Sequence, residues 1–324
     1  MKAIVCKEFA AVDTLEYADM PDPIIKPGHV LIDVKAAGVN FPDNLLVQGL
    51  YQMKPDLPFI PGSEVAGIIL ELGEGVPHLK VGQQVIGLCM LGGYAQKVLV
   101  PMSHVMPIPT DIPLDEAAGL VTAHATAHHG LKQRAQIRTG EILLVTGAAG
   151  GTGLAAVQIG KEMGATVIAV CSSDEKCAVA KQNGADYCIN YSTEDLKQSV
   201  KELTKNRGVD VVYECVGGDM FHTCSRLMAW NGRLLIIGFA GGEIPKFPVN
   251  LALVKGYSVM GVFWGSFTQH QPQDFMQNMQ ELVDWYLKGK VKVVIDKSFK
   301  LSDSIDALNY VTSRQVKGKV VITP

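Results

Sequence analysis

The chain has 324 residues, 48% of them hydrophobic and 33 of them glycine, which is enough for two folded domains with many tight turns. Its formal net charge is -3 and its pI is near 6.2. This balance excludes a chain-wide basic surface, so we expect no nucleic-acid partner.

The cysteines and the first residues bear on the compartment. The seven cysteines are scattered, with no CxxC pair and no even-numbered set that would form a disulfide framework. This predicts reduced thiols in a cytosol-like compartment. The N-terminus enters a strand pattern, MKAIVCKEF, without a charged leader, and no apolar run approaches the ~18 residues of a membrane span. We therefore expect a cytoplasmic protein without membrane contact.

Short apolar runs broken by Gly and Pro fill residues 1–120 and predict antiparallel β-structure with irregular loops. Pro-Gly turns precede the strands that we expect at 30–35 and 64–72. Residues 40–61, between them, show little periodicity. Long loops inside compact domains are more often functional than idle, so this one is a candidate substrate wall; the alternative is a solvated connection. Its polar residues are Asn40, Asp43, Asn44 and Tyr51.

A helical pattern covers residues 115–135 and links this part to the next. Within it, His124 and His128 are spaced i, i+4 and His129 is adjacent. Such a pair can bind a metal ion, but no HExxH arrangement or clear third ligand is present. The pattern favours side-chain packing over a metal site.

Residues 141–176 carry the most informative pattern of the chain. The apolar run 142–145 predicts a strand buried on both faces, and glycines follow at once at 147, 150, 151 and 153, before a helix and a strand at 165–170. This order is typical of a mononucleotide-binding half of a doubly wound sheet, with a pyrophosphate at the helix N-terminus. Ala148 departs from the GxGxxG fingerprint, and a glycine turn without a ligand is the alternative.

The end of the second strand predicts which coenzyme binds. NAD sites usually carry Asp or Glu there, to bind the ribose 2′-hydroxyl. This chain has Cys171, Ser172 and Ser173 instead, and Lys176 stands within reach of a 2′-phosphate. NADPH is therefore favoured over NADH. These residues also fit a capped first helical turn with a solvated lysine, and both interpretations can hold together.

Helices and strands then alternate to about residue 263. We expect a helix at 192–206 opened by a Ser-x-x-Asp cap, a strand at 209–215, a helix at 220–230 and a strand at 234–237. Val216-Gly217 and Gly238-Phe239-Ala240 follow the two strands and place bare backbone where a dinucleotide lies. A last strand at 257–263, with Trp264 and Gly265 at its tip, is an edge that invites pairing with a second copy, so we expect a homodimer.

After residue 266 the pattern predicts a helix at 273–288, a strand near 293, a helix at 302–312 and a final strand, GKVVI. With these elements located, the chain resembles the quinone oxidoreductases of the medium-chain dehydrogenase/reductase superfamily, including the zeta-crystallin-like and quinone-oxidoreductase-like branches, over nearly its whole length. The motifs that carry the resemblance are AAGVNFPD at 36–43, PGSEVAG at 61–67, GGYAQ at 92–96, TAHHGL at 126–131, GAAGGTGLAAVQIGKEMGA at 147–165, GADYCINY at 184–191, DVVYECVGG at 210–218 and SRQVKGKVV at 313–321.

The resemblance implies an α/β protein with a GroES-like catalytic domain, 1–122 and 264–324, and an inserted Rossmann domain, 123–263, with the active site in the cleft. Lys176, Tyr191 and Arg314 then look like the group around the 2′-phosphate of NADPH. Asn40, Tyr51 and Thr126 look like polar groups on the nicotinamide and substrate side, and Tyr51 and Asn40 are the candidate catalytic residues. The other candidate coenzyme-binding residues are Ala149, Gly150, Gly151, Thr152, Gly153, Ser172, Ser173, Val216, Gly217, Gly238, Phe239, Ala240, Phe263, Trp264 and Gly265.

The departures from zinc-dependent members bear on the chemistry. Ser63 stands where those members have a ligand histidine, Asn40 stands near the position of their catalytic cysteine, and their four-cysteine lobe is missing. We therefore expect no metal site, and an acceptor whose own π-system takes up negative charge. The hypotheses are NADPH-dependent reduction of quinones, reduction of enoyl thioesters or enones, and NADPH binding in a structural role.

Overall fold

The computed structural model describes all residues from 1 to 324 and divides into two compact units. Unit 1 comprises Met1–Thr122 and Val293–Pro324, and unit 2 comprises Ala123–Lys292. The sequence predicts the second domain boundary after residue 263. In the structure unit 2 continues to Lys292 and therefore includes the helices that follow residue 263. The domain limits 1–122, 123–263 and 264–324 stay a prediction.

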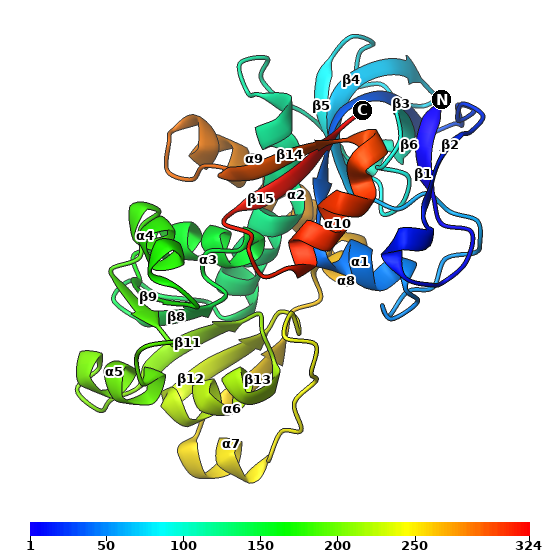
Figure 1. Ribbon diagram of the computed structural model, residues 1–324. Helices are drawn as coiled ribbons and strands as arrows, with labels where there is room; N and C mark the ends of the chain where they lie inside the picture. The colour runs from blue at the N-terminus through cyan, green and yellow to red at the C-terminus, as the bar shows by residue number, and fades with distance from the viewer. The chain divides into compact units, whose positions relative to one another are not determined.

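Unit 1 is a β-rich body that both ends of the chain build. A seven-stranded sheet has the order β14-β15-β3-β4-β5-β7, and β6 pairs with β3; a two-stranded sheet joins β1 and β2. In Figure 1 the red strand β15 therefore lies in the same sheet as the blue and cyan strands from the start of the chain. The strands are β1 Lys2–Val5, β2 Glu16–Asp19, β3 His29–Val39, β4 Glu64–Leu72, β5 Gln84–Leu88, β6 Lys97–Pro101, β7 Val105–Pro107, β14 Ile295–Lys300 and β15 Lys319–Thr323.

The core of unit 1 is made by the inward faces of β3 and its neighbours. Val30, Ile32 and Val34 alternate along β3 and are almost fully buried, as the period of two in a strand requires. The strand expected at 30–35 is confirmed and is longer, and the strand at 64–72 agrees with β4. Antiparallel β-structure in this part of the sequence is therefore confirmed.

Helices close the sheet of unit 1. The expectation of irregular structure at 40–61 is wrong at its start, where α1 forms, because Asp43 accepts a hydrogen bond from the backbone N–H of Asn40 (2.8 Å) and caps the helix. Pro42 in the first turn also favours the helix. The helical segments are η1 Val12–Thr14, α1 Phe41–Val47, η2 Met102–His104, η4 Leu301–Asp303 and α10 Ser304–Thr312; α2 Leu114–His129 begins in this unit and ends in unit 2.

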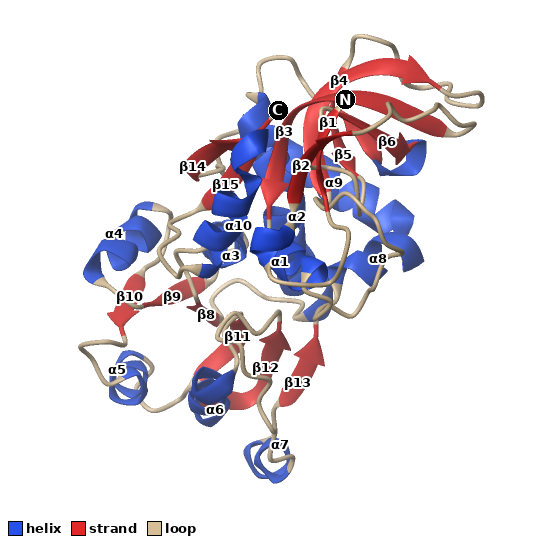
Figure 2. Cartoon of the chain, turned by 45° about the vertical axis from the view of Figure 1, so that its right-hand side comes forward, coloured by secondary structure: helices blue, strands red, loops and turns tan.

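Unit 2 is built on a six-stranded parallel sheet of the order β10-β9-β8-β11-β12-β13. Figure 2 shows these strands side by side in this order. The chain starts at the central strand β8, proceeds outward to β10, and then crosses back to β11, which is the doubly wound order. The expected Rossmann sheet is confirmed. Its strands are β8 Ile142–Thr146, β9 Thr166–Cys171, β10 Tyr187–Asn190, β11 Val209–Glu214, β12 Met228–Ile236 and β13 Ser258–Gly261.

Helices pack on this sheet between successive strands. Helix α3 contacts β8 and β9, α4 contacts β9 and β10, and α6 contacts β11 and β12. A π-helical turn, η3, continues the end of α2. The helices are η3 Gly130–Arg134, α3 Gly151–Glu162, α4 Asp174–Gln182, α5 Leu196–Leu203, α6 Gly218–Leu227, α7 Asn250–Lys255, α8 Trp264–His270 and α9 Pro272–Leu287.

Two expected boundaries in unit 2 are wrong. The cap of α5 is Asp195 and not Ser192, because the Asp195 side chain accepts a hydrogen bond from Gln198 N (2.9 Å), while the Ser192 hydroxyl donates to the carbonyl of Ser172 (2.9 Å). Helix α6 also ends early, and its expected last residues begin β12 at Met228. Parallel pairing of Met228 with Val209 in the neighbouring strand decides this boundary, which local pattern does not show.

The expectation that all cysteines are reduced thiols is wrong for one pair. Cys177 on α4 and Cys188 on β10 form a disulfide, with their Cα atoms 5.5 Å apart. The other five cysteines are free. The pair escaped notice because the ten residues between the two cysteines include most of α4 and a turn, and only the packing of that helix on the strand brings the sulfurs together. None of the helices combines the length and the apolar character that crossing a bilayer requires.

Candidate functional site

The glycine turn after β8 forms a tight junction with α3. Gly147 has a positive φ of 60°, and its carbonyl accepts a hydrogen bond from Gly150 N (2.9 Å). A Cβ on Gly153 would lie 2.2 Å from that carbonyl oxygen, so only glycine allows the helix to pack this closely. Gly150 caps the helix without a side-chain hydrogen bond, and the first-turn N–H groups are free of a capping side chain. This arrangement fits a bound pyrophosphate.

Thr152, in the first turn of α3, uses its side chain within the protein. Its hydroxyl lies 2.6 Å from the Tyr213 hydroxyl and donates to the carbonyl of Ala123 (3.1 Å). Thr126 lies on α2 and is partly exposed. Thr152 therefore joins α3 to β11 and to α2, while its backbone N–H remains part of the helix N-terminus.

A buried carboxylate that the sequence did not reveal shapes the next loop. Glu214 ends β11 and accepts hydrogen bonds from Val216 N (2.7 Å), Gly217 N (3.0 Å) and the Thr146 hydroxyl (3.1 Å). Burial raises the pKa of Glu214, and these donors oppose the shift. Thr146 ends β8, so the carboxylate fixes the Val216-Gly217 turn against the strand that leads into the glycine turn. In the sequence, only the glycines that follow Glu214 indicated a special loop here.

The loop after β12 lies against the same turn. Ala240 N donates to Cys215 O (3.0 Å), and Gly241 N donates to Val216 O (2.8 Å). The structure thus brings together the two loops that the sequence places at the carboxyl edge, Val216-Gly217 and Gly238-Phe239-Ala240. Their neighbouring strands β11 and β12 are parallel, so both loops leave the same edge of the sheet.

The segment after β9 forms the candidate adenosine end. The Ser173 hydroxyl caps α4 by accepting from Lys176 N (3.3 Å). Ser172 and Lys176 are partly exposed, and Tyr191, which directly follows β10, is 43% exposed. Tyr191 N donates to Cys171 O (3.1 Å), so these residues lie on two adjoining segments. The expected capped helical turn is thus present. Of the residues that could bind a 2′-phosphate, Ser173 and Lys176 belong to this turn and Tyr191 lies on the adjoining segment.

The residues after β13 differ in exposure. Phe263 is 51% exposed, whereas Trp264 is buried and its ring lies edge-on against Phe275, with centroids 5.8 Å apart. Gly265 follows in the first turn of α8. The Trp264 side chain therefore packs in unit 2, while Phe263 is half-exposed and Gly265 is partly exposed. Arg314 belongs to unit 1, where it is exposed between α10 and β15 with a positive φ of 62°.

Two histidines of α2, His128 and His129, pack against α8 and α9. The ring of His128 lies 3.1 Å from Glu281 Oε2 and edge-on to Trp285, and His129 stacks on Phe267 at 3.8 Å between centroids. Burial lowers the pKa of His128 to about 4, so the ring is neutral at pH 7. These contacts are the packing that the sequence favours.

In unit 1, Asn40 sits in a buried network of charges. Its side-chain amide donates to Glu64 Oε1 (2.7 Å) and accepts from Lys319 Nζ (2.6 Å), and Lys319 Nζ lies 2.7 Å from Glu64 Oε1. Thr122 N donates to the other Glu64 oxygen (2.6 Å). A Cβ on Gly38 would lie 2.1 Å from Glu64 Oε1, so glycine in β3 makes room for the carboxylate. Glu64 and Lys319 are functional candidates that the sequence analysis missed.

Asp43 and two tyrosines adjoin this network. The Tyr94 hydroxyl donates to Asp43 Oδ2 (2.7 Å), the oxygen that also accepts from Asn40 N. Burial raises the pKa of Asp43 to about 6. Tyr51 packs partly buried against the core, and burial, with a smaller effect of the Asp43 charge, raises its pKa. Its hydroxyl is therefore protonated at neutral pH and can donate a hydrogen bond.

Comparisons with known proteins cover both units. A family model described as Alcohol dehydrogenase GroES-like domain matches residues 26–110, and one described as Zinc-binding dehydrogenase matches residues 151–285. Quinone oxidoreductase-like protein 2 of Rattus norvegicus is 39% identical over 323 residues, 99% of this chain and 92% of that protein.

Solved structures extend the likeness to the whole chain. The quinone oxidoreductase of Thermus thermophilus, known also as its complex with NADPH, is 32% identical with a TM-score of 0.87 and covers 100% of both chains. CurK enoyl reductase is 28% identical with a TM-score of 0.90 and covers 99% of this chain and 98% of that one.

Proposed function

Because the chain belongs to the quinone oxidoreductase family of the medium-chain dehydrogenase/reductase superfamily, we propose that it reduces quinones with NADPH and without a bound metal ion. NADPH supplies the hydride when it is bound. The observation that carries the proposal is the glycine junction of unit 2, where the first-turn N–H groups of α3 have no capping side chain and Gly153 contacts the turn directly.

The residues of unit 2 hold the coenzyme in this proposal. The turn at Gly150 and the α3 N-terminus bind the pyrophosphate, and Ser173, Lys176 and Tyr191 bind the 2′-phosphate. The carboxylate of Glu214 keeps the Val216-Gly217 turn in place beside the coenzyme. From the resemblance alone we infer that Arg314 also binds the 2′-phosphate. On the same ground we infer that the backbone of Phe263 lines the coenzyme.

The polar groups of unit 1 serve the acceptor. Asn40 is held by Glu64 and Lys319, so its amide is oriented before a ligand arrives. Tyr51 donates a hydrogen bond to the acceptor oxygen, because its hydroxyl stays protonated. A conjugated acceptor such as a quinone spreads the incoming negative charge over its own π-system, so a hydrogen bond suffices where a simple ketone would need a cation.

Metal independence rests on the residues near Asn40. Glu64 is already paired with the Lys319 ammonium (2.7 Å), which neutralises the buried carboxylate that the Asn40 amide contacts. Ser63 and Asn40 replace the histidine and cysteine ligands of zinc-dependent members. Elemental analysis of active protein checks this point: stoichiometric zinc would contradict it.

A second candidate is the reduction of enoyl thioesters or enones. The likeness to CurK enoyl reductase supports it, and Tyr51 could donate a proton in that reaction as well. The first experiment compares kcat/KM for NADPH oxidation with 1,2-naphthoquinone, crotonyl-CoA and 2-alkenals, after subtraction of the protein-free rate. Preference for the quinone is expected. Preference for the enoyl substrates would favour the second candidate, and tight NADPH binding without turnover would favour a structural role.

We also propose that two copies pair through the edge of the parallel sheet. Strand β13 is the last strand of that sheet, and apolar side chains near it are exposed: Trp230 (73%), Leu253 (83%) and Val254 (73%). Trp230 lies on β12, next to the edge strand, and its ring lies over Gly256, the residue that ends α7, so these exposed apolar side chains come from neighbouring segments. A second copy would cover it. A cytoplasmic location stays a prediction.

A further inference from the structure

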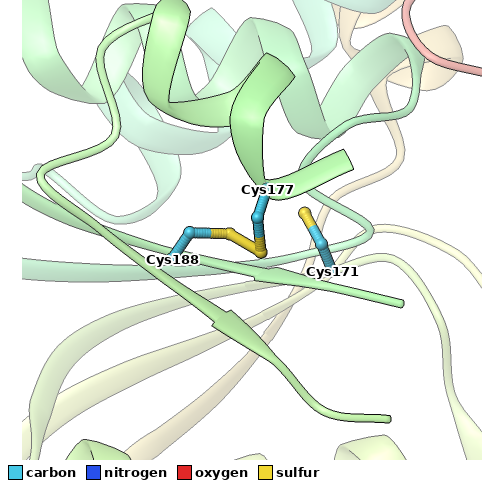
Figure 3. Close-up of side chains that lie close together, drawn as sticks. All are labelled: Cys171, Cys177 and Cys188. Carbon is cyan, nitrogen blue, oxygen red and sulfur yellow. A yellow bond between two sulfur atoms is a disulfide. The ribbon is translucent and has the colours of Figure 1, made fainter. Parts of the chain in front are cut away.

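Three cysteines of unit 2 bring their sulfurs together at one end of the parallel sheet. Cys171 ends β9, Cys177 lies in α4 and Cys188 lies on β10, and Figure 3 shows the bonded pair with the sulfur of Cys171 beside it. All three sulfurs lie within 4.8 Å of one another. Cys171 and Cys177 are buried, whereas Cys188 is partly exposed. Of the three residues, Cys188 is therefore the most accessible to a small oxidant in solution.

The disulfide joins the two segments that carry the candidate 2′-phosphate ligands. Cys177 directly follows Lys176, and Cys188 precedes Tyr191 by three residues. Hydrogen bonds join the same segments: Asn190 Nδ2 donates to Asp174 Oδ1 (2.8 Å), and the Ser192 hydroxyl donates to Ser172 O (2.9 Å). The disulfide thus adds a covalent bond to the hydrogen bonds that already join these two segments, which carry the proposed 2′-phosphate ligands.

We propose that Cys177 and Cys188 are a reversible redox pair, closed by a hydroperoxide and opened by a dithiol, whose state sets the affinity for NADPH. The proposal rests on the proposed function of this site as the binding place of the coenzyme. When closed, the disulfide limits movement of the first turn of α4 relative to the end of β10. The phosphate ligands are then held ready for binding, and less conformational freedom is lost when NADPH binds.

The oxidation step balances with hydrogen peroxide as oxidant. The Cys188 thiolate attacks one peroxide oxygen, the O–O bond breaks, and hydroxide leaves, so that Cys188 becomes a sulfenic acid. Cys177 then attacks the Cys188 sulfur, the S–O bond breaks, and the S–S bond forms. The thiol protons and the released hydroxides make water, so two thiols and one peroxide give one disulfide and two waters.

Cys171 stands beside the pair without taking part. Burial raises its pKa to about 11, although the nearby Lys176 charge opposes the shift. Because the thiolate is the reactive form, a buried thiol of this kind exchanges slowly with a neighbouring disulfide. Cys171→Ala is therefore the matched control, since it removes one sulfur of the cluster and keeps the pair.

The experiment measures thiol number and coenzyme affinity on the full chain in both states. Alkylation of unfolded protein should modify seven cysteines after dithiothreitol and five after hydrogen peroxide, with Cys177 and Cys188 in one cross-linked peptide. Titration calorimetry should give a Kd for NADPH about 3- to 10-fold higher in the reduced state, which corresponds to about 0.7–1.4 kcal/mol. The Kd for NADH should change less than about twofold, because NADH lacks the 2′-phosphate.

The variants separate the possible outcomes. Cys188→Ser and Cys188→Ala, at a partly exposed position, should lose the redox response, and Cys171→Ala should keep it. Equal Kd values for NADPH in the two states would overturn the inference and leave the proposed function standing. A reduced cluster that binds stoichiometric zinc and resists peroxide would overturn it in favour of a metal site. Absence of NADPH binding in both states would overturn the inference and the proposed function together.

Discussion

Lys176 and Asp43 show how differently single charges are used in the two units. Lys176 is a partly exposed cation on the first turn of a helix, where the sequence pattern alone indicated a phosphate ligand. Asp43 is a carboxylate buried beneath Tyr94 and the Asn40 backbone, and the sequence showed only that it lay in a loop of polar residues. The phosphate role of Lys176 stays a prediction from residue type and spacing, whereas the burial of Asp43 depends on Tyr94, which lies 51 positions away in the chain.

The first prediction concerns Lys176. Lys176→Ala should raise the Kd for NADPH about 10- to 100-fold and leave the Kd for NADH nearly unchanged, because a charged hydrogen bond to phosphate contributes roughly 1.5 to 3 kcal/mol. Calorimetric titration with both coenzymes measures the difference. Lys181→Ala, near the end of the same helix, is the control and should bind both as the parent protein does. Equal losses for NADPH and NADH would show that Lys176 does not bind the 2′-phosphate.

The second prediction concerns pH and Asp43. Its pKa of about 6 in the folded protein exceeds the ordinary value of 3.8, so between these values the folded protein holds a proton that the unfolded chain has released. Stability relative to Asp43→Asn should therefore fall as pH rises from about 4 to 6, by about 3 kcal/mol in total, and level off above. Urea unfolding of both proteins at pH 4, 5, 6 and 7 tests this. If the difference in unfolding free energy between the two proteins were constant from pH 4 to 7, Asp43 would not hold this extra proton in the folded state.

At the scale of elements, strong local signals were confirmed and tertiary ones were missed. The sequence predicted β8, α3 and β9 because apolar runs and glycines fix strand, turn and helix within a few residues. It missed α1, whose cap depends on Asp43, and it started β12 six residues late, because pairing with β11 outweighs the local pattern there. The charge pair of Glu64 with Lys319 was also missed, since 255 positions separate the two residues and only sheet pairing unites them.

The third prediction distinguishes two glycines of the same turn. Gly150 has an ordinary φ of −83°, and a Cβ there would meet Gly147 O at 3.4 Å, an ordinary contact. Gly150→Ala should keep its unfolding midpoint but bind NADPH at least about tenfold more weakly, because the methyl group occupies space that the pyrophosphate needs. Gly153→Ala should lose about 1–3 kcal/mol of stability by overpacking, since its Cβ would clash at 2.2 Å.

Thermal unfolding and NADPH titration of both variants check this contrast. The control for helix stability is Ala155→Gly, which changes a residue of α3 without adding a methyl group. Gly140→Ala would not serve as a control, because the φ of Gly140 is 85°, a value that strains any side chain. If Gly150→Ala bound NADPH like the parent protein, the pyrophosphate would have to lie elsewhere.

At the scale of the whole molecule, the exposed apolar surface at Trp230, Leu253 and Val254 distinguishes one edge of the parallel sheet from the other. At the opposite edge, Tyr187 on β10, Tyr191 directly after it and Leu203 on α5 are less exposed, at 45%, 43% and 38%. The sequence indicated an edge at residues 257–263 but not α7, which supplies most of the surface. That helix is short and was not expected between two strands.

The fourth prediction follows from this asymmetry. Leu253→Asp combined with Val254→Asp should convert the proposed dimer to a monomer, because two charges would be buried without partners at the interface. Light scattering after size exclusion should then give the chain mass of 34.9 kDa, against twice that mass for the parent protein. Tyr187→Asp, at the opposite edge, should leave the mass unchanged. A parent protein that is monomeric at micromolar concentration would refute the interface.

The position of β15 in the sheet of unit 1 has a consequence for synthesis in the cell. One sheet partner of β3 and the ammonium that neutralises Glu64 belong to a strand that is made at least 280 residues after β3. Unit 2, by contrast, is continuous in sequence and can close its sheet while the chain is still growing. The sheet of unit 1 is thus completed after that of unit 2, and until then it exposes an open strand edge of the kind that promotes aggregation and a carboxylate without its cation.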